Sequence, residues 1–269
     1  MPEDSIIASA AQRLILTLFR YFPDTWTMTQ EYCNHLGQPI GFPLPGWRSP
    51  PRPPRTPMQG RYCRLEPLDP DRHARDLHAA NALDAEGRNW TYLGSGPFDG
   101  FDAYLQWMKS SCLGEDPLFQ AIIDLETGSA AGVAAYMRID TRNGVVEVGN
   151  INYSPRLQRK RAATEAMFLM MKHAFELGYR RYEWKCDSLN ARSRAAAQRL
   201  GFSYEGLFRQ AAVYKGRSRD TAWFAMIDTE WPHIEQAFTR WLDPGNFDAE
   251  GRQRARLAEL TASVLKQRG

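Results

Sequence analysis

A strand-like run that turns through a basic loop into a long amphipathic helix constrains this chain more than any other feature. After "VVEVGNINY" comes the loop "SPRLQRKR", and apolar residues then recur at helical spacing as far as Gly178. These apolar positions are Ala163, Ala166, Met167, Met170, Met171, Ala174 and Leu177. Four cations, Arg156, Arg159, Lys160 and Arg161, crowd the start of the helix, where its dipole already places partial positive charge. A polyanion such as a pyrophosphate, bound to the free N–H groups of such a turn, would make this cluster favourable.

The spacing of the basic loop alone allows three explanations. The loop is a phosphate site, a solvated basic turn, or a patch for nuclear import or nucleic acid. The net charge of the 269-residue chain is only +3, and no aromatic residues interleave with the cations, so nucleic acid is not an expected partner. Local patterning leaves the first two explanations open.

The four cysteines, Cys33, Cys63, Cys112 and Cys186, lie far apart, with neither a CxxC pair nor a Cys/His cluster. This spacing predicts reduced thiols in a cytoplasmic protein, with no disulfide framework and no metal site. With 43% hydrophobic residues, the chain can bury a full core.

The N-terminal part is divided into an extension over residues 1–42 and a proline-rich arm over residues 43–59. The extension begins with acidic residues, and Gln12 and Arg13 interrupt its apolar run, so neither a secretory signal nor an integral membrane association is expected. It contains an amphipathic helix pattern. The segment is an accessory helix packed on the domain, a stretch that precedes the working translation start at Met28, or a membrane-surface anchor. The arm contains seven prolines, which favour extended chain. We interpret it as a segment lying on the surface of the protein and not as an SH3-type ligand.

The strand-like and helix-like runs of residues 60–229 predict one domain with the order β-α-α-β-β-β-α-β-α-β-β. A capping Asp69 and Pro70 start the first helix, and Asn143-Gly144 marks a hairpin between two strands. The order predicts an α+β fold with a mixed, mostly antiparallel sheet and helices on both faces. Residues 230–269 are expected to form a helical tail.

Two further motifs follow the basic loop at regular spacing. Gln158 opens the loop, "DSLNARS" carries Asn190 and Ser193, and "LGFSYEG" carries Gly201, Phe202 and Gly206. Together they resemble the acetyl-CoA-binding core of the GCN5-related N-acetyltransferases (the GNAT superfamily). The resemblance covers residues 61–228 and is closer to the branch that acetylates N-terminal serine and alanine of ribosomal proteins.

This resemblance implies direct transfer of an acetyl group from acetyl-CoA, a cosubstrate, to a primary amine. The acceptor would be a protein N-terminal Ser or Ala, or a small-molecule amine. A module that binds acyl-CoA without catalysis is the alternative. The oligomeric state stays open, with a homodimer among the options.

The resemblance also implies which residues contact the coenzyme. They are Ile151, Asn152, Tyr153, Gln158, Arg159, Lys160, Arg161, Ala162, Ala163 and Asn190. A backbone N–H at a strand bulge near residues 150–152 would bind the thioester oxygen. Arg161 and Ala163 stand where the family loop has its first glycine and its second small residue.

Glu147 and Ser193 are the candidate catalytic residues implied by the resemblance. Glu147, eleven residues before Gln158, would accept the amine proton, and Ser193 would protonate the leaving thiolate. A surface carboxylate and a helix cap are the respective alternatives. Trp90 and Tyr92 would line the acceptor pocket, or belong to the core. Ala212 replaces the glutamate of the ribosomal-protein branch, and Ala197 replaces a tyrosine common in the family.

Overall fold

The computed structural model describes residues 32–269, and the chain divides into two compact units between Trp47 and Arg48. In the first unit, strands β1 (Tyr32–Cys33) and β2 (Pro39–Ile40) pair antiparallel. The Oδ1 atom of Asn34 closes this hairpin by accepting the backbone N–H groups of Leu36 and Gln38. The amphipathic helix expected near the N-terminus and the alternative start at Met28 lie outside the described residues.

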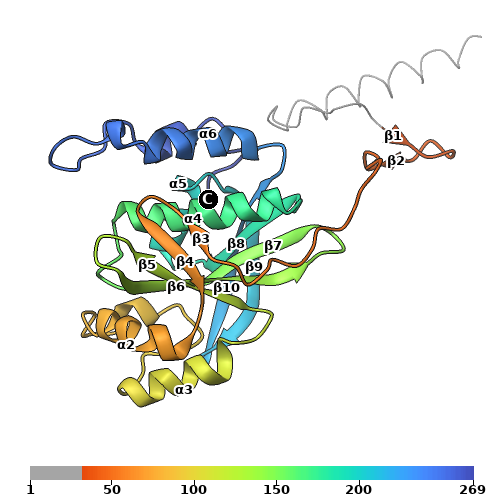
Figure 1. Ribbon diagram of the computed structural model, residues 1–269. Coiled ribbons are helices and arrows are strands. Elements are labelled where there is room, and N and C mark those ends of the chain that lie inside the picture. Colours follow the sequence, from red (N-terminus) through yellow and green to blue (C-terminus); the bar gives the residue numbers. More distant parts are fainter. Residues whose placement is uncertain (1–31) are drawn as a thin grey trace, which may run out of the picture. The chain divides into compact units, whose positions relative to one another are not determined.

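The second unit is built on an eight-stranded sheet with the order β3-β4-β5-β6-β7-β8-β10-β9 (Figure 1). All neighbouring strands pair antiparallel except β7 and β8, which are parallel. The strands are β3 (Met58–Gln59), β4 (Cys63–Pro67), β5 (Leu118–Asp124), β6 (Ser129–Asp140), β7 (Val145–Tyr153), β8 (Arg181–Asp187), β9 (Ser203–Tyr214) and β10 (Arg217–Ile227).

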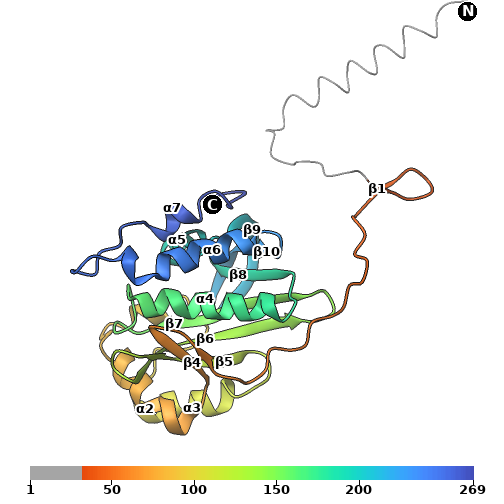
Figure 2. The same ribbon diagram turned by 45° about the horizontal axis from the view of Figure 1, so that its top comes forward.

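Helices cover both faces of this sheet. Figures 1 and 2 show α2 and α3 on one face and α4, α5 and α6 on the other. The helices are α2 (Pro70–Asn81), α3 (Phe101–Ser111), α4 (Arg161–Glu176), α5 (Ala191–Arg199), α6 (Trp231–Leu242) and α7 (Leu257–Leu260), with 3-10 turns η2 (Arg88–Trp90) and η3 (Pro244–Asn246). The predicted α+β fold, with a mostly antiparallel sheet and helices on both faces, is therefore confirmed.

Local chemistry explains several of these elements. The Asp69 side chain accepts the Asp71 N–H at 3.0 Å, and Pro70 fills the first position of α2, where no N–H is required. The apolar face of α4 packs into the larger core cluster with β6, β7 and β8. Within it, the buried Tyr136 hydroxyl donates to the Met170 carbonyl at 2.7 Å. A second core cluster lies under α2 and α3.

One carboxylate on α4 holds the start of the sheet. Glu165 is buried, and its Oε1 accepts the N–H of Arg61 at 2.9 Å. Its Oε2 accepts the N–H of Tyr62 at 2.6 Å and that of Cys63 at 2.8 Å. These charge-assisted bonds fasten the turn between β3 and β4 to the helix that follows the basic loop.

Residues 48–57 contain neither helix nor strand, as a segment rich in proline would. The Arg55 guanidinium donates to the carbonyls of Leu113 and Gly114 and pairs with Glu115. The Pro51 carbonyl accepts the Tyr179 hydroxyl at 3.1 Å. This segment is therefore fastened to the surface beside β5 and the end of α4.

Candidate active site

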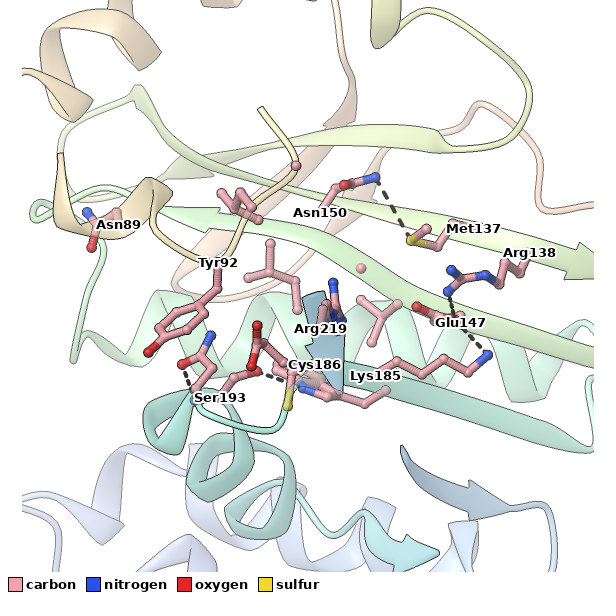
Figure 3. A pocket seen from close by; sticks show the side chains of 18 residues that line it. Asn89, Tyr92, Met137, Arg138, Glu147, Asn150, Lys185, Cys186, Ser193 and Arg219 are labelled. Carbon is pink, nitrogen blue, oxygen red and sulfur yellow. Dashed lines mark hydrogen bonds and ion pairs between the residues drawn. The ribbon is translucent and has the colours of Figure 1, made fainter. Parts of the chain in front are cut away.

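The two parallel strands of the sheet separate part-way along their length. β7 pairs with β8 only from Val145 opposite Arg181 to Val148 opposite Trp184, although β7 continues to Tyr153. A cavity of about 190 Å³ lies where they part (Figure 3). Its polar and charged lining residues are Asn89, Tyr92, Arg138, Glu147, Asn150, Lys185, Asp187, Asn190, Ser193 and Arg219.

The β7 side of the cavity contains a bulge. Gly149 pairs with Ala135 and Asn152 with Val133, so Asn150 and Ile151 together face one residue of β6. Asn150 also has a positive φ of 49°. The bulge lies within the predicted range, and it brings Asn150 and Ile151 to the cavity. Asn152 instead returns to the ladder and is buried outside the lining.

Glu147 lies in the cavity wall and is only 3% exposed. Its Oε2 is 2.6 Å from Arg138 Nη1 and 2.9 Å from Lys185 Nζ. Lys185 Nζ also lies 2.6 Å from Glu183 Oε2. Glu147 is therefore not a free surface carboxylate but a buried member of a charge network, which Figure 3 shows at one end of the cavity.

Ser193 lies in the first turn of α5 and also lines the cavity. Asn190, not Ser193, caps this helix, because its Oδ1 accepts the Ser193 N–H at 3.1 Å. The Ser193 Oγ accepts the Trp184 Nε1–H at 3.0 Å, and the same hydroxyl forms a hydrogen bond with the Cys186 side chain, which also lines the cavity. Burial raises the pKa of the neighbouring Cys186 thiol, which therefore stays protonated.

Two of the four cations in the basic loop are already matched by the protein. Lys160 Nζ lies 2.9 Å from both Asp124 Oδ2 and Glu126 Oε2, and the hydrogen bond with Asp124 raises the Lys160 pKa. The Arg161 guanidinium lies over the rings of Phe247, 4.3 Å from its centroid, and Tyr62, 5.2 Å away.

Fewer cations of the loop are free to bind a ligand than the sequence suggested. Arg156 and Arg159 are exposed, and neither makes a hydrogen bond or ion pair with any residue from 32 to 269. No side chain caps the start of α4, where Ala162 and Ala163 are buried. Its backbone N–H groups and the two arginines are the remaining features that suit a phosphate.

The other predicted contact residues of this region have structural partners. Gln158 Nε2 donates to the Tyr153 carbonyl at 2.8 Å and to Asn89 Oδ1 at 2.9 Å. The Tyr153 hydroxyl donates to the Ala163 carbonyl at 3.1 Å. These bonds fix the path of the chain from β7 into α4.

The two candidate acceptor aromatics lie at different cavities. Tyr92 lines the cavity between β7 and β8, and its hydroxyl donates to the Leu189 carbonyl at 3.2 Å. Trp90 is buried with Phe98 and Tyr104 and lines a separate cavity of about 350 Å³ beside α2. The structure thus brings Tyr92, but not the Trp90 side chain, to the other candidate residues.

Sequence reasoning missed several residues of the site, among them Asp187 and Arg219. Asp187, at the end of β8, accepts the Leu189 N–H at 2.9 Å and the Tyr214 hydroxyl at 2.7 Å. Burial and the bond to Asp187 raise the Tyr214 pKa to about 12. Arg219 reaches the cavity from β10. The alternation of charged residues in "RYEWKCD" could have indicated Asp187, because residues two apart share one face of a strand.

Within residues 32–269, no group of three or more His, Cys, Asp or Glu side chains is arranged to hold a metal ion. No helix in this part of the chain is long and apolar enough to cross a membrane.

Comparison with known proteins decides the family. Residues 63–203 match the family model described as "Acetyltransferase (GNAT) domain". The chain belongs to the GNAT family of acetyltransferases. It is therefore an N-acetyltransferase that depends on acetyl-CoA, as the resemblance of its motifs indicated. No curated protein matches the chain.

Solved structures agree with this GNAT assignment. A GCN5-related N-acetyltransferase from Brucella melitensis is 46% identical, with a TM-score of 0.80, over 81% of this chain and 100% of that chain. A probable GNAT-family acetyltransferase from Chromobacterium violaceum is 43% identical, with a TM-score of 0.68, over 72% and 97% of the two chains. The microcin C7 self-immunity acetyltransferase MccE, solved with acetyl-CoA and AMP, shares the fold at 21% identity and a TM-score of 0.55, over 62% and 93%.

Proposed function

We propose that this GNAT enzyme acetylates a primary α-amine, either a protein N-terminal Ser or Ala or a small α-amine. The observation that supports this is the cavity between β7 and β8. Bulged backbone lies on one side of it and the Ser193 hydroxyl on the other. A thioester requires both kinds of group, since its oxygen gains negative charge and its sulfur leaves as a thiolate.

The described residues suit acetyl-CoA as the donor. The uncapped start of α4 and the exposed Arg156 and Arg159 offer N–H groups and positive charge to a pyrophosphate. In this proposal Lys160 and Arg161 shape the loop and do not neutralise the phosphates, because their charges are engaged by Asp124 and by the ring of Phe247. Arg161 sits in the first turn of α4, so the missing glycine does not distort the backbone.

The proposed reaction needs three movements. The amine nitrogen bonds to the thioester carbonyl carbon, the C–S bond breaks, and the sulfur receives the Ser193 proton, which a water molecule replaces as Glu147 releases the amine proton to solvent. The amine proton passes to Glu147, directly or through a water molecule. Asp187 is a second carboxylate in the cavity, but hydrogen bonds from Leu189 and Tyr214 already engage both of its oxygens.

An α-amine is a more suitable acceptor than a lysine side chain. The α-amino pKa of a peptide N-terminus is about 7.7–8.0, against about 10.4 for lysine, so the neutral lysine costs roughly 3–4 kcal/mol more than a neutral N-terminus at pH 7. The absence of a carboxylate at Ala212 leaves the enzyme less able to offset that cost. We therefore expect little acetylation of internal lysines.

The test combines purified protein and acetyl-CoA with three acceptor groups. These are peptides beginning with Ser or Ala, small α-amines, and Nα-blocked peptides whose only amine is a lysine. Free thiol release and the mass of the product are measured. Acetylation of the first or second group supports the proposal. Selective lysine acetylation would contradict it, and a melting-temperature increase with acetyl-CoA but no product would identify a binding module.

A further inference from the structure

The cavity contains one cation that the protein does not match. Arg219 reaches the cavity from β10, and Figure 3 shows it between the Glu147 and Ser193 ends of the cavity in this view. Its Nε is buried and has no hydrogen-bond partner. Among residues 32–269 no carboxylate lies within 4.0 Å of the guanidinium, whose recorded neighbours are the Tyr214 ring, 5.8 Å from its centroid, and the Cys186 thiol.

Every other cation of the cavity is paired. Arg138 and Lys185 both contact Glu147, and Lys185 also contacts Glu183. A partly buried guanidinium without hydrogen bonds loses hydration that nothing replaces, which is costly. The position of Arg219 is therefore unfavourable unless an anion enters the cavity.

The carboxylate that follows Arg219 in the chain, Asp220, and the one that pairs with Thr221 from β8, Asp187, are both engaged elsewhere. Asp187 holds the Leu189 N–H and the Tyr214 hydroxyl, and Asp220 accepts the Gln210 N–H at 2.7 Å. The residue directly opposite Arg219 on β9 is Ala212. Directly opposed residues of neighbouring strands share one face, so a carboxylate there would meet Arg219, whereas alanine leaves the space open.

Acetyl-CoA does not supply the missing anion. If the proposed function is correct, its phosphates lie at the start of α4, and the pantetheine arm and thioester that reach the cavity carry no charge. The anion must then belong to the acceptor. A guanidinium binds a carboxylate through two parallel N–H···O bonds, a geometry that a neutral group does not match.

We propose that the acceptor is an α-amino acid or a close analogue, with its carboxylate bound by Arg219 and its amine on the side of Glu147. This inference rests on the proposed function and narrows it to small acceptors that carry a carboxylate beside the amine. Arg219 and Glu147 have opposite charges and line the same cavity, which suits an acceptor with a carboxylate beside its amine. A peptide N-terminus has an amide in place of that carboxylate and is bound less well.

The experiment uses four matched acceptor pairs: L-alanine, L-serine, L-methionine and L-phenylalanine, each against its amide. The carboxylate raises the amine pKa, so amine basicity alone would favour the amide at neutral pH. We expect the opposite order, with kcat/KM higher for at least one acid than for its amide. Arg219→Gln should lower kcat/KM for that acid by about 30-fold or more, as loss of a buried charge contact does, and leave the amide unchanged.

Arg217→Gln is the matched control, because Arg217 is exposed at the start of the same strand. Arg219→Lys keeps the charge without the two-point contact and should recover part of the preference. Because Arg219 is unmatched, Arg219→Gln should not lower the melting temperature. Equal losses for acid and amide would overturn the proposal and assign Arg219 to the reaction centre, and an unstable variant would assign it to the fold.

Calorimetry with coenzyme A present separates this inference from the proposed function, because coenzyme A carries no acetyl group to transfer. The acids should bind more tightly than their amides, and Arg219→Gln should remove the difference. If the acids bind more tightly than their amides but are not acetylated, the carboxylate site at Arg219 is supported and the acetyltransferase proposal is refuted for these acceptors. Turnover of amines without selective binding in any of the four pairs would support the acetyltransferase proposal and refute the carboxylate site at Arg219.

Discussion

The proposed coenzyme site at the start of α4 and the proposed acceptor site in the cavity between β7 and β8 differ in how the protein matches their cations. At the start of α4, Lys160 is neutralised by Asp124 and Glu126, and Arg161 lies over two aromatic rings. On the acceptor side, Arg219 has no ionic partner among the described residues. A cation that is matched at rest stabilises the fold, whereas an unmatched one gains its partner only when a ligand binds. Counting cations in the sequence therefore overestimates the first site and misses the second.

Ser193 lines the cavity in which the thioester is proposed to react, and its loss should have the largest effect. Ser193→Ala should lower kcat by about 10²–10⁴-fold, because thiolate protonation is lost, with little change in acetyl-CoA affinity. Single-turnover kinetics and calorimetry measure the two quantities. Ser188→Ala is the matched control, since the Ser188 side chain makes no recorded hydrogen bond. A loss below about threefold would remove Ser193 from the chemistry.

Glu147 tests whether a residue bound by two cations still takes part in proton transfer. Glu147→Gln should lower kcat/KM near pH 7 by about 10²-fold, and the deficit should shrink as pH rises and the amine loses its proton unaided. Lys185 keeps Glu183 and Arg138 is exposed, so the change strands no buried cation. A pH profile parallel to that of the unmodified enzyme would limit Glu147 to a structural role.

Ala212→Glu should give Arg219 an ionic partner within the protein, as Lys160 already has. The new carboxylate would lie opposite Arg219 and pair with it, so the preference for acids over their amides should fall by about 10-fold or more. Ala211→Glu adds the same charge on the other face of β9 and should leave the preference intact. Kinetics with the matched acceptor pairs measure this, and an unchanged preference in Ala212→Glu would argue against a carboxylate at Arg219.

Two neighbouring cations of the basic loop should respond in opposite ways. Arg159→Gln should weaken acetyl-CoA binding by about three- to tenfold and leave the melting temperature unchanged, because its charge is free. Lys160→Gln should destabilise the protein by about 1–3 kcal/mol, since buried Asp124 loses its cation, with little effect on affinity. Calorimetry and thermal unfolding distinguish these results, and reversed outcomes would mean that Lys160 serves the coenzyme.

Local patterns predicted the features that depend on nearby residues. The strand, bulge and helix around Gln158, and the positions of Asn190 and Ser193, follow from spacing within one motif. Arg161 could not be understood in this way, because Phe247, which it contacts, belongs to the tail 86 positions later. Arg219 reaches the cavity only because β10, not β9, is the neighbour of β8. Strand order depends on contacts between distant segments, which short-range periodicity does not describe.

The Glu165 tether has a consequence for how the domain forms. Its carboxylate binds backbone groups 102 to 104 positions earlier, so the contact closes a very long loop of chain. Closing such loops costs entropy before the contacts compensate for it, and domains rich in distant contacts fold slowly. The turn between β3 and β4 should therefore bind to Glu165 late in folding. Until then, the N–H groups of residues 61–63 would lack their carboxylate partner, so this turn, although synthesised early, is among the last parts of the domain to be secured.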